Sequence, residues 1–379
     1  MMKNAIKHTR HDKKWTLTTL FIAVIFGLGV MTIAHPAKAI SMSERRKLAQ
    51  LPAITIDSID SGKYFRDLEA FMLDQFPWRD YFLRIKAFNQ FYIYRLKDNH
   101  NIFVKNGTAV AISYPFATGA DELAARKMSA LIDDYFQDMN VYMSIIPDKA
   151  YYLAGQNGYP AIDYSKMLET IQKGCPKAVY IDIFDTLTAG DYYRTDSHWK
   201  QECLQPAVFR LLAAMNRRQM ESSFEQHALF PFYGVYCGQS ALPLDPDTMT
   251  YLTSDLLDHA LVYRATANSE GFEKAPLYFP DMISKNDPYD VFLGGACSVI
   301  ILENPDYQGD PKDLYLFSDS FGRSIAPRLL EGYNRVYMID IRYIRSSRLP
   351  ELVHYQDGSD VLFLYSIETL DTASSLNTD

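Results

Sequence analysis

The sequence contains few cysteines, histidines and tryptophans, with 4, 8 and 3 of them among 379 residues. The cysteines are too far apart for a zinc knuckle, and the histidines beyond the N-terminal segment lack the short spacing of metal ligands. Internal repeats and low-complexity tracts are also absent. These absences exclude a repeat protein and a disordered tail, and they predict a folded chain without a metal or a cofactor.

Positive charge is scarce beyond the N-terminus. Of 38 basic and 46 acidic residues, five basic and one acidic lie in the first 14 positions, which leaves 33 basic and 45 acidic residues for the rest. An acidic surface repels the phosphates of nucleic acids. We therefore expect no nucleic-acid partner.

The sequence has one long apolar segment, Trp15–Ala34, which reads "WTLTTLFIAVIFGLGVMTIA". It carries no charge and is long enough to cross a hydrocarbon core of about 30 Å as a helix. The basic flank places the N-terminus in the cytoplasm. Residues 1–40 are thus predicted to be a basic tail and a single-pass anchor in the cell membrane, with the main domain extracytoplasmic. The alternative is a signal peptide, cleaved at a site that includes Ala37 and Ala39, and a secreted product.

Export makes disulfides chemically feasible among the four cysteines, and the sequence does not select a pairing. A chain of this length needs no disulfide to hold its core, and unpaired cysteines are commonly buried. We therefore favour buried free thiols at Cys175, Cys203, Cys237 and Cys297.

A helical stalk is predicted over residues 41–104. Apolar residues recur at spacings of three and four from Tyr64 to Leu96, and Pro77 interrupts this pattern. The pair Asn106-Gly107 predicts a tight turn followed by a short strand. The main domain is therefore expected over residues 105–379.

Helix and strand patterns alternate at both ends of this domain, which predicts parallel βαβ units. Strands are expected at 140–147, 178–184, 313–320, 335–341 and 360–366, and helices at 119–139, 163–174, 326–332 and 349–356. The intervening residues, about 218–305, are aromatic and turn-rich and predict a β-rich insertion. The fold class is therefore three-layer α/β with a parallel sheet.

The stretch "YYRTDSHWK" brings an acid and an imidazole, Asp196 and His198, within two positions. In an extended segment these two side chains point to the same side, so the carboxylate is placed to orient the imidazole. Ser320 follows an apolar strand and precedes a helix, at the edge where open α/β sheets bind ligands. These three residues are candidates for a catalytic triad, in which Ser320 is the nucleophile.

Each of these residues also has a structural interpretation. Asp196 or Ser197 would cap a helix that begins at His198, and Asp319 or Ser320 would cap the helix after Gly322. His198 would alternatively be a buried core residue beside a tryptophan.

Several stretches together resemble the DHHW family of exported bacterial proteins, over most of residues 60–379. They are "DQFPWRD", "SIIPDKAYY", "VYIDIFDTL", "YYRTDSHW" and "FSDSFG". That family is similar to the SGNH-hydrolase-like domains of alginate O-acetyltransferase accessory proteins. The resemblance implies a flavodoxin-like parallel sheet and a Ser-His-Asp triad whose acid and base precede the serine in the chain.

The resemblance assigns a role to each residue of the triad. Asp196 orients the ring, His198 is the general base, and Ser320 attacks an acetyl ester. Two positions depart from the pattern. Ser197 stands where the four-residue motif DHHW has its first histidine, and Ser318 stands where SGNH enzymes usually have glycine.

Other residues are weaker candidates for the site. The backbones of Ser320, Gly294 and Gly295 are expected to hold the oxyanion. Four residues beside the acid or at strand ends are expected to bind the substrate: Tyr193, Arg194, Lys149 and Arg342. The alternatives are surface or ion-pair roles, such as an ion pair between Arg194 and the acid of the triad.

The predicted function is acetyl transfer to a cell-envelope or secreted polysaccharide. The alternatives are a carbohydrate acetylesterase and a catalytically silent polysaccharide-binding or assembly protein. An exported transferase has no access to cytoplasmic acetyl-CoA. A membrane-bound protein that passes acetyl groups outward is therefore an expected partner.

Overall fold

The computed structural model describes residues 2–41, 43–219, 223–266 and 270–378, and for residues 2–14 it describes only the helical backbone. The chain divides into two compact units. The first comprises residues 1–96 and 238–243, and the second comprises residues 97–237 and 244–379. The division falls at Leu96, somewhat before the expected boundary near residue 105.

The first unit starts with the helix α1, Met2–Ala34. Its residues Trp15–Ala34 have a mean hydropathy of 2.3 and are long and apolar enough to cross a membrane. Length and composition are compatible with a single membrane span and with a signal sequence alike.

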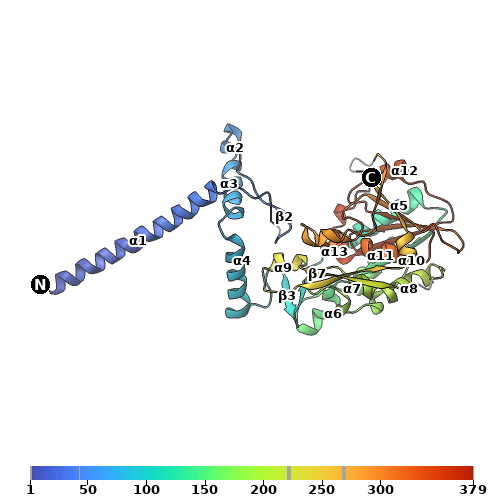
Figure 1. The fold of residues 1–379 in the computed structure, drawn as a ribbon, viewed down its shortest axis with the longest axis horizontal. Coiled ribbons are helices and arrows are strands. Elements are labelled where there is room, and N and C mark those ends of the chain that lie inside the picture. Colours follow the sequence, from blue (N-terminus) through green and yellow to red (C-terminus); the bar gives the residue numbers. More distant parts are fainter. Residues whose placement is uncertain (1, 42, 220–222, 267–269, 379) are drawn as a thin grey trace. The chain divides into compact units, whose positions relative to one another are not determined.

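The predicted stalk is helical and is interrupted near Pro77 (Figure 1). Its helices are α2, Ile56–Asp60, α3, Lys63–Asp74, and α4, Arg79–Phe88, which continues into a π-helical turn over residues 89–93. The break follows from the sequence, because a proline disfavours helical conformation in the residue before it. A short strand pair precedes these helices, β1 over Ile40–Ser41 and β2 over Arg46–Lys47.

The second unit opens with a hairpin of β3, Ile102–Lys105, and β4, Thr108–Ala111. The turn between them is Asn106-Gly107, and both residues have positive φ angles of 49° and 77°. Such a turn matches the twist of the two strands, as the sequence predicts.

Five parallel strands form the central part of an eight-stranded sheet, in the order β13-β12-β14-β5-β6. They are β5, Asn140–Ile146, β6, Val179–Tyr180, β12, Asp313–Ser318, β13, Arg335–Ile339, and β14, Asp360–Ser366. Counted from β12, this order is 2-1-3-4-5, which is the flavodoxin-like order. The chain enters this arrangement at its fourth strand, so the segments that follow β5 and β6 come before β12 in the sequence.

Part of the insertion extends the same sheet with three antiparallel strands in the order β10-β9-β11, of which β11 pairs with β13. Their bounds are β9, Leu261–Ala265, β10, Phe272–Ala275, and β11, Val299–Glu303. The predicted β-rich insertion thus adds antiparallel strands to one edge of the predicted parallel sheet. Antiparallel neighbours need only short connections and leave no periodic crossover helix in the sequence, so alternation of helices and strands did not reveal them.

A second part of the insertion forms a separate hairpin, β7, Glu225–Phe232, and β8, Asp247–Thr253. Between its strands lies the short helix α9, Val235–Ser240. This hairpin reaches the candidate active site, as described below.

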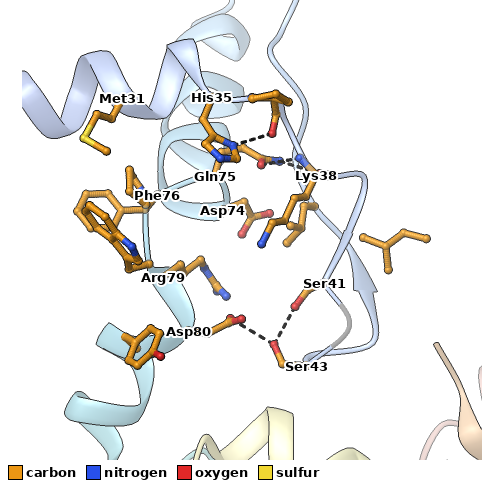
Figure 2. A pocket seen from close by; sticks show the side chains of 16 residues that line it. Met31, His35, Lys38, Ser41, Ser43, Asp74, Gln75, Phe76, Arg79 and Asp80 are labelled. Atoms are coloured by element: carbon orange, nitrogen blue, oxygen red, sulfur yellow. Dashed lines mark hydrogen bonds between the residues drawn. The ribbon is translucent and has the colours of Figure 1, made fainter. Parts of the chain in front are cut away.

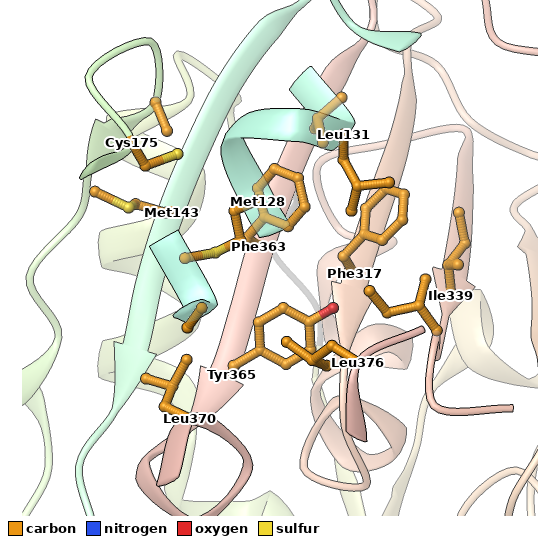
Figure 3. Packing of buried hydrophobic residues seen from close by; sticks show 14 of the residues in the cluster. Met128, Leu131, Met143, Cys175, Phe317, Ile339, Phe363, Tyr365, Leu370 and Leu376 are labelled. Carbon is orange, nitrogen blue, oxygen red and sulfur yellow. The ribbon is translucent and has the colours of Figure 1, made fainter. Parts of the chain in front are cut away.

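Alternate residues of the parallel strands face opposite helical layers, as expected for a sheet covered on both sides. Met143, Phe317 and Phe363 belong to one apolar cluster with Met128 and other residues of the first helix layer (Figure 3). Their neighbours in the strands belong to a second cluster with the other helix layer. The three-layer prediction is thus confirmed.

The first layer contains α5, Ala120–Tyr135, α7, Tyr164–Gly174, and α13, Ile367–Asp371, and the second contains α8, Gln205–Ala214, and α11, Gly322–Leu329. The remaining short helices are α6, Lys149–Leu153, α10, Asp255–His259, and α12, Leu349–Leu352. Helix α11 starts four residues before its predicted start, and Pro327 lies inside it and not in its first turn.

All four cysteines are free thiols in the structure; Cys175 is fully buried, whereas Cys203, Cys237 and Cys297 are only partly buried, so the prediction of burial was wrong for these three. We expect that a reducing agent leaves the melting temperature of the folded protein unchanged. A thiol reagent should detect four thiols after unfolding under non-reducing conditions. A melting temperature that falls on reduction, or a count below four, would show that the exported protein forms a disulfide.

Candidate active site

A tight loop carries Asp196 and His198. The loop is closed by an antiparallel bridge between Tyr192 and Trp199 and by the amide of Tyr193, which donates to the carbonyl of His198 at 3.1 Å. The prediction of an extended segment is therefore wrong in detail. The two side chains still converge, because the amide and the ring of His198 both bond to the same oxygen of Asp196.

The strand β12 ends at Ser318, and Ser320 lies in the turn before α11. Asp319 holds this turn: its Oδ1 accepts from the amide of Phe321 at 3.0 Å, and its Oδ2 accepts from the amide of Ser366 at 2.9 Å. Ser366 ends the neighbouring strand β14. The turn is thus tied both to its own helix and to the next strand.

The position in this turn that is too closely packed for a side chain is Gly322, and not Ser318. A Cβ at Gly322 would lie 2.7 Å from both Cβ and Oγ of Ser318, closer than atoms of neighbouring side chains approach. Ser318 itself is accommodated, because its hydroxyl donates to the carbonyl of Leu364 at 2.7 Å. The serine that departs from the Gly-Asp-Ser pattern is therefore compatible with the turn.

The structure brings the three candidate residues into one chain of hydrogen bonds. His198 Nδ1 lies 2.6 Å from Asp196 Oδ1, and His198 Nε2 lies 2.8 Å from Ser320 Oγ. Because the carboxylate only accepts, the ring donates through Nδ1, and Nε2 is left to accept the proton of the serine hydroxyl. This geometry is that of a base poised to deprotonate a nucleophile.

Asp196 is fully buried, and its second carboxylate oxygen is also satisfied. Oδ2 accepts from the amide of Val235 at 2.8 Å. Next to it, the amide of Gly234 donates to Thr195 Oγ1 at 2.9 Å, and the amide of Tyr236 donates to the carbonyl of Thr195 at 3.0 Å. Residues of the insertion therefore form the wall against which the acid is held.

A second acid of the insertion, Asp247, supports the same loop. Its Oδ1 accepts from the amide and Nε of Arg194, each at 3.1 Å, and its Oδ2 accepts from the amide and Oγ1 of Thr195 at 2.8 and 2.7 Å. Asp247 is itself buried. Four donors on two adjacent residues fix the backbone just before Asp196.

Aromatic residues cover the imidazole of His198. The ring of Tyr289 stacks on it with centroids 3.7 Å apart, and the ring of Phe321 lies 4.6 Å away at a tilt. The hydroxyl of Tyr289 donates to Ser324 Oγ at 2.9 Å, and Ser324 Oγ in turn accepts from the indole of Trp199 at 2.8 Å. The stacked tyrosine is thus itself fixed by hydrogen bonding, and it holds the plane of the imidazole in its alignment with the serine.

Two of the predicted substrate contacts, Tyr193 and Arg194, have partners within the protein. Tyr193 is fully buried in an apolar cluster and packs edge-on against Phe232 at 4.8 Å. Arg194 pairs with Asp247, and not with the acid of the candidate triad, although nearly half of its side chain is exposed. Burial argues against the predicted substrate contact of Tyr193, whereas the exposed part of Arg194 leaves its predicted role as a proposal.

Lys149 was expected in the crevice but lies beneath the loop, with an exposed fraction of 3%. Its Nζ donates to the carbonyl of Tyr193 at 2.8 Å and lies over the ring of Tyr236. Burial lowers the pKa of Lys149 to about 7, although the charges of Asp196 and Asp247 oppose this shift. Its position accounts for a supporting role and argues against the predicted contact with substrate.

Arg342 follows the end of β13 and makes two hydrogen bonds to Asp340, at 2.9 and 2.7 Å. A quarter of its side chain is exposed. The ion pair uses two of the five N–H donors of the guanidinium, and substrate binding by Arg342 stays a prediction.

The expected oxyanion donors differ in their surroundings. A Cβ at Gly294 would lie 2.8 Å from Phe279, and one at Gly295 would lie 2.4 Å from Asp290, so both glycines are required by close packing. Near the serine, the amides of Phe321, Gly322 and Arg323 donate to acceptors within the turn. Among the described residues the amide of Ser320 has no acceptor, which suits the predicted role of this amide.

Within the described parts of the chain, no group of three histidine, cysteine or acidic side chains could hold a metal ion. The residues that sequence reasoning missed are Gly234, Val235, Asp247 and Tyr289, all from the insertion. The sequence predicts a β-rich insertion without giving the order of its elements, and a lone glycine or aspartate in it gave no signal of its contacts with the loop.

Solved structures show the same fold at low sequence identity. A DHHW family protein from Eubacterium siraeum is 19% identical with a TM-score of 0.60, and the match covers 74% of this chain and 95% of that one. PatB1 of Bacillus cereus, in a structure with a sulfonyl adduct, is 16% identical with a TM-score of 0.55, and the match covers 71% and 95%. A second structure of PatB1 gives 15% identity and a TM-score of 0.52.

No family model matches the sequence, and no curated protein matches it. The structural neighbours therefore show that this chain shares their α/β fold, and they include a protein of the DHHW family, which the five sequence stretches resemble.

The contact between Gly234 and the loop leads to a prediction. A Cβ at Gly234 would lie 2.1 Å from the carbonyl oxygen of Thr195 and 2.5 Å from Asp196 Cβ. We expect Gly234→Ala to displace the acid and to lower the free energy of unfolding by about 1–3 kcal/mol, the usual cost of overpacking. Denaturant titration would measure the change in stability. The proton resonances of the His198 ring, which depend on its distance from Asp196, would report the displacement of the acid.

Gly155→Ala is the matched control, because a Cβ at Gly155 meets no atom within 4 Å. This variant should behave as wild type in both measurements. Equal effects of the two substitutions would contradict the role assigned to Gly234.

The buried amine of Lys149 predicts a dependence of stability on pH. Its pKa falls from an ordinary value near 10.5 to about 7 on folding, so above pH 7 the unfolded state binds more protons than the native state. The free energy of unfolding should therefore rise with pH between 7 and 8.5, by up to about 1.4 kcal/mol per pH unit from this residue. Denaturant titrations at several pH values would measure the slope.

Lys149→Met removes the amine and keeps most of the side-chain volume. Its slope should be smaller than that of wild type over the same range. Identical slopes in the two proteins would show that Lys149 stays charged in the folded state.

Proposed function

We propose that this protein transfers acetyl groups to a cell-envelope or secreted polysaccharide outside the cytoplasm, with Ser320 as nucleophile, His198 as general base and Asp196 as the orienting acid. One observation carries the proposal: the unbroken chain of hydrogen bonds from Asp196 through His198 to Ser320, at 2.6 and 2.8 Å. A cap or a core histidine would not need both of these contacts. The fold shared with a DHHW family protein agrees with the proposal.

The reaction has two steps. As Ser320 Oγ attacks the carbonyl carbon of an acetyl ester, His198 Nε2 takes the hydroxyl proton, and the imidazolium is stabilised by Asp196. The carbonyl oxygen becomes an oxyanion, which the amide of Ser320, in the turn before α11, stabilises. The His198 proton then passes to the leaving oxygen of the donor, and an acetyl-serine remains.

The second step regenerates the serine. A sugar hydroxyl gives its proton to His198 Nε2 and attacks the acetyl carbonyl, and the proton returns to Ser320 Oγ as the ester bond breaks. Water in place of the sugar gives acetate and makes the protein an esterase. A bound polysaccharide favours transfer, because a positioned hydroxyl competes with water through its high effective concentration.

In this proposal the protein acts at the membrane, outside the cytoplasm. The helix over Trp15–Ala34 anchors the chain as a single span, with the second unit on the extracytoplasmic side. Because acetyl-CoA is cytoplasmic, the acetyl group reaches Ser320 through a membrane-bound partner. The reaction needs no metal and no cofactor, because the base and the nucleophile are both supplied by the chain.

Small acetyl esters test the nucleophile. The purified protein should release acetate slowly from p-nitrophenyl acetate, and Ser320→Ala should lower the rate at least about a thousandfold, because triad residues act as a unit. His198→Ala should have nearly the same effect, and Asp196→Ala a smaller one, because the acid orients the base without transferring the proton. A sulfonyl fluoride should modify Ser320 in wild type and not in His198→Ala, as mass spectrometry of the peptide would show.

Ser165→Ala, at an exposed serine in α7, is the control and should keep full activity. All variants should show the melting profile of wild type. Acetyl groups found on an added polysaccharide identify a transferase, and acetate alone identifies an esterase. Polysaccharide binding without turnover that depends on Ser320 would overturn the proposal in favour of a binding protein.

A further inference from the structure

The helix α4 and the residue before it expose one apolar face. Trp78, Tyr81, Phe82, Ile85 and Phe88 recur at spacings of three and four, so they lie on one side of the helix. Their exposed fractions are between 49% and 68%. A continuous face of large apolar side chains is costly in water and indicates an interaction surface.

This face begins next to the last turns of the apolar helix α1. Met31 of α1 and His35, the residue that follows this helix, line a cavity of about 570 Å³ together with Phe76, Trp78 and Tyr81 (Figure 2). Contacts deeper along α1 agree with this placement, since Met72 Cε lies 4.0 Å from the position that a Cβ would take at Gly29. The end of α3 and the start of α4 therefore pack beside the C-terminal end of the apolar segment.

The length of the apolar segment sets the depth of this contact in a membrane. Its 20 residues extend about 30 Å as a helix, which matches the hydrocarbon thickness of a bilayer. Gly29 precedes Ala34 by five residues, so it lies roughly 7–8 Å inside the outer end of the span. The segment from Met72 to Tyr81 would then lie where the acyl chains meet the headgroups.

The side chains of α4 suit that layer. Tryptophan and tyrosine are enriched where apolar chains meet polar headgroups, and helices that lie in this layer bury one face by about 5–10 Å. Arg84 and Lys86 are exposed and, at 3.6 residues per turn, project on opposite sides of the apolar face. Long basic side chains in that position reach the phosphates while their stems stay with the apolar face.

We propose that α4 lies in the outer interface of the bilayer that holds the span, with Trp78, Tyr81, Phe82, Ile85 and Phe88 directed into the lipid. Continuity with the span selects lipid as the occupant, in place of a second copy or another protein. The inference rests on the proposed membrane insertion of residues 15–34, and it is independent of the proposed acetyl transfer.

The three tryptophans of the chain allow a direct test in the full-length protein, reconstituted in vesicles of phosphatidylethanolamine and phosphatidylglycerol. Lipids brominated near the headgroup quench the fluorescence of a tryptophan that lies in the interface. Trp15→Phe leaves Trp78 as the reporter, and the double variant Trp15→Phe/Trp78→Phe measures the background from Trp199, which is fully buried. We expect Trp78 to be quenched well above that background and to emit at shorter wavelength than in water.

Trp78→Phe keeps Trp15, at the other end of the span, and reports on insertion separately. Quenching of Trp15 without quenching of Trp78 would overturn the inference and leave the anchor standing. Absence of quenching at Trp15 would overturn both.

A charge in the middle of the face provides the second measurement. Ile85→Glu in the Trp15→Phe background should greatly reduce the quenching of Trp78, because a carboxylate is costly in the interface, and the exposed position should tolerate it in folding. Gln137→Glu adds the same charge at an exposed position outside the stalk and should leave the quenching unchanged. Unchanged quenching in Ile85→Glu, or cross-linking of Ile85→Cys between two copies in place of lipid exposure, would contradict lipid as the occupant.

Discussion

The burial of Asp196 is the constraint on which the rest of the candidate site depends. A carboxylate without access to water is stable only when its oxygens are fully hydrogen-bonded, and here the acceptor sites are filled by the ring and amide of His198 and by the amide of Val235. Because one of these donors is the imidazole, the cost of burying the acid is offset only when His198 is held in the tautomer that leaves Nε2 free to face Ser320. Stability and the alignment of the base therefore come from the same contact.

The insertion supplies the surfaces that make this burial feasible. The backbone of Gly234 lies against Thr195 so closely that no side chain fits between them, and Asp247 holds the loop from the start of β8. Tyr289 closes the face of the imidazole. The parallel sheet presents Ser320 at a strand end, while the insertion fixes the acid and the base opposite to it, so each half of the site is built by a different part of the chain.

Strand order explains why the acid and base come before the serine along the chain. The five parallel strands have the flavodoxin-like order when counted from β12, but the chain enters the sheet at β5. The loop that follows β6 is then early in sequence, although β5 and β14 are hydrogen-bonded neighbours in the sheet. The arrangement of a parallel sheet does not depend on which strand comes first in the chain, because each strand contacts only its neighbours. The carboxyl ends of the strands therefore still form one edge.

Local patterns in the sequence were sufficient for the apolar segment, the stalk broken at Pro77, the five parallel strands and the three reactive residues, because each of these depends on a periodicity or on residue types within a few positions. Tertiary structure alone decided the antiparallel strands β9 to β11, the support of the loop by Gly234 and Asp247, and the burial of Lys149 and Tyr193, for which contact with substrate had been expected. Burial and close packing arise between segments far apart in the chain, and a lysine after a strand end looks the same in sequence whether it faces a crevice or lies beneath a loop. Residue type and spacing therefore determined which groups could react, whereas the packing of the insertion against the sheet decided which of them are brought together and which only hold the others in place.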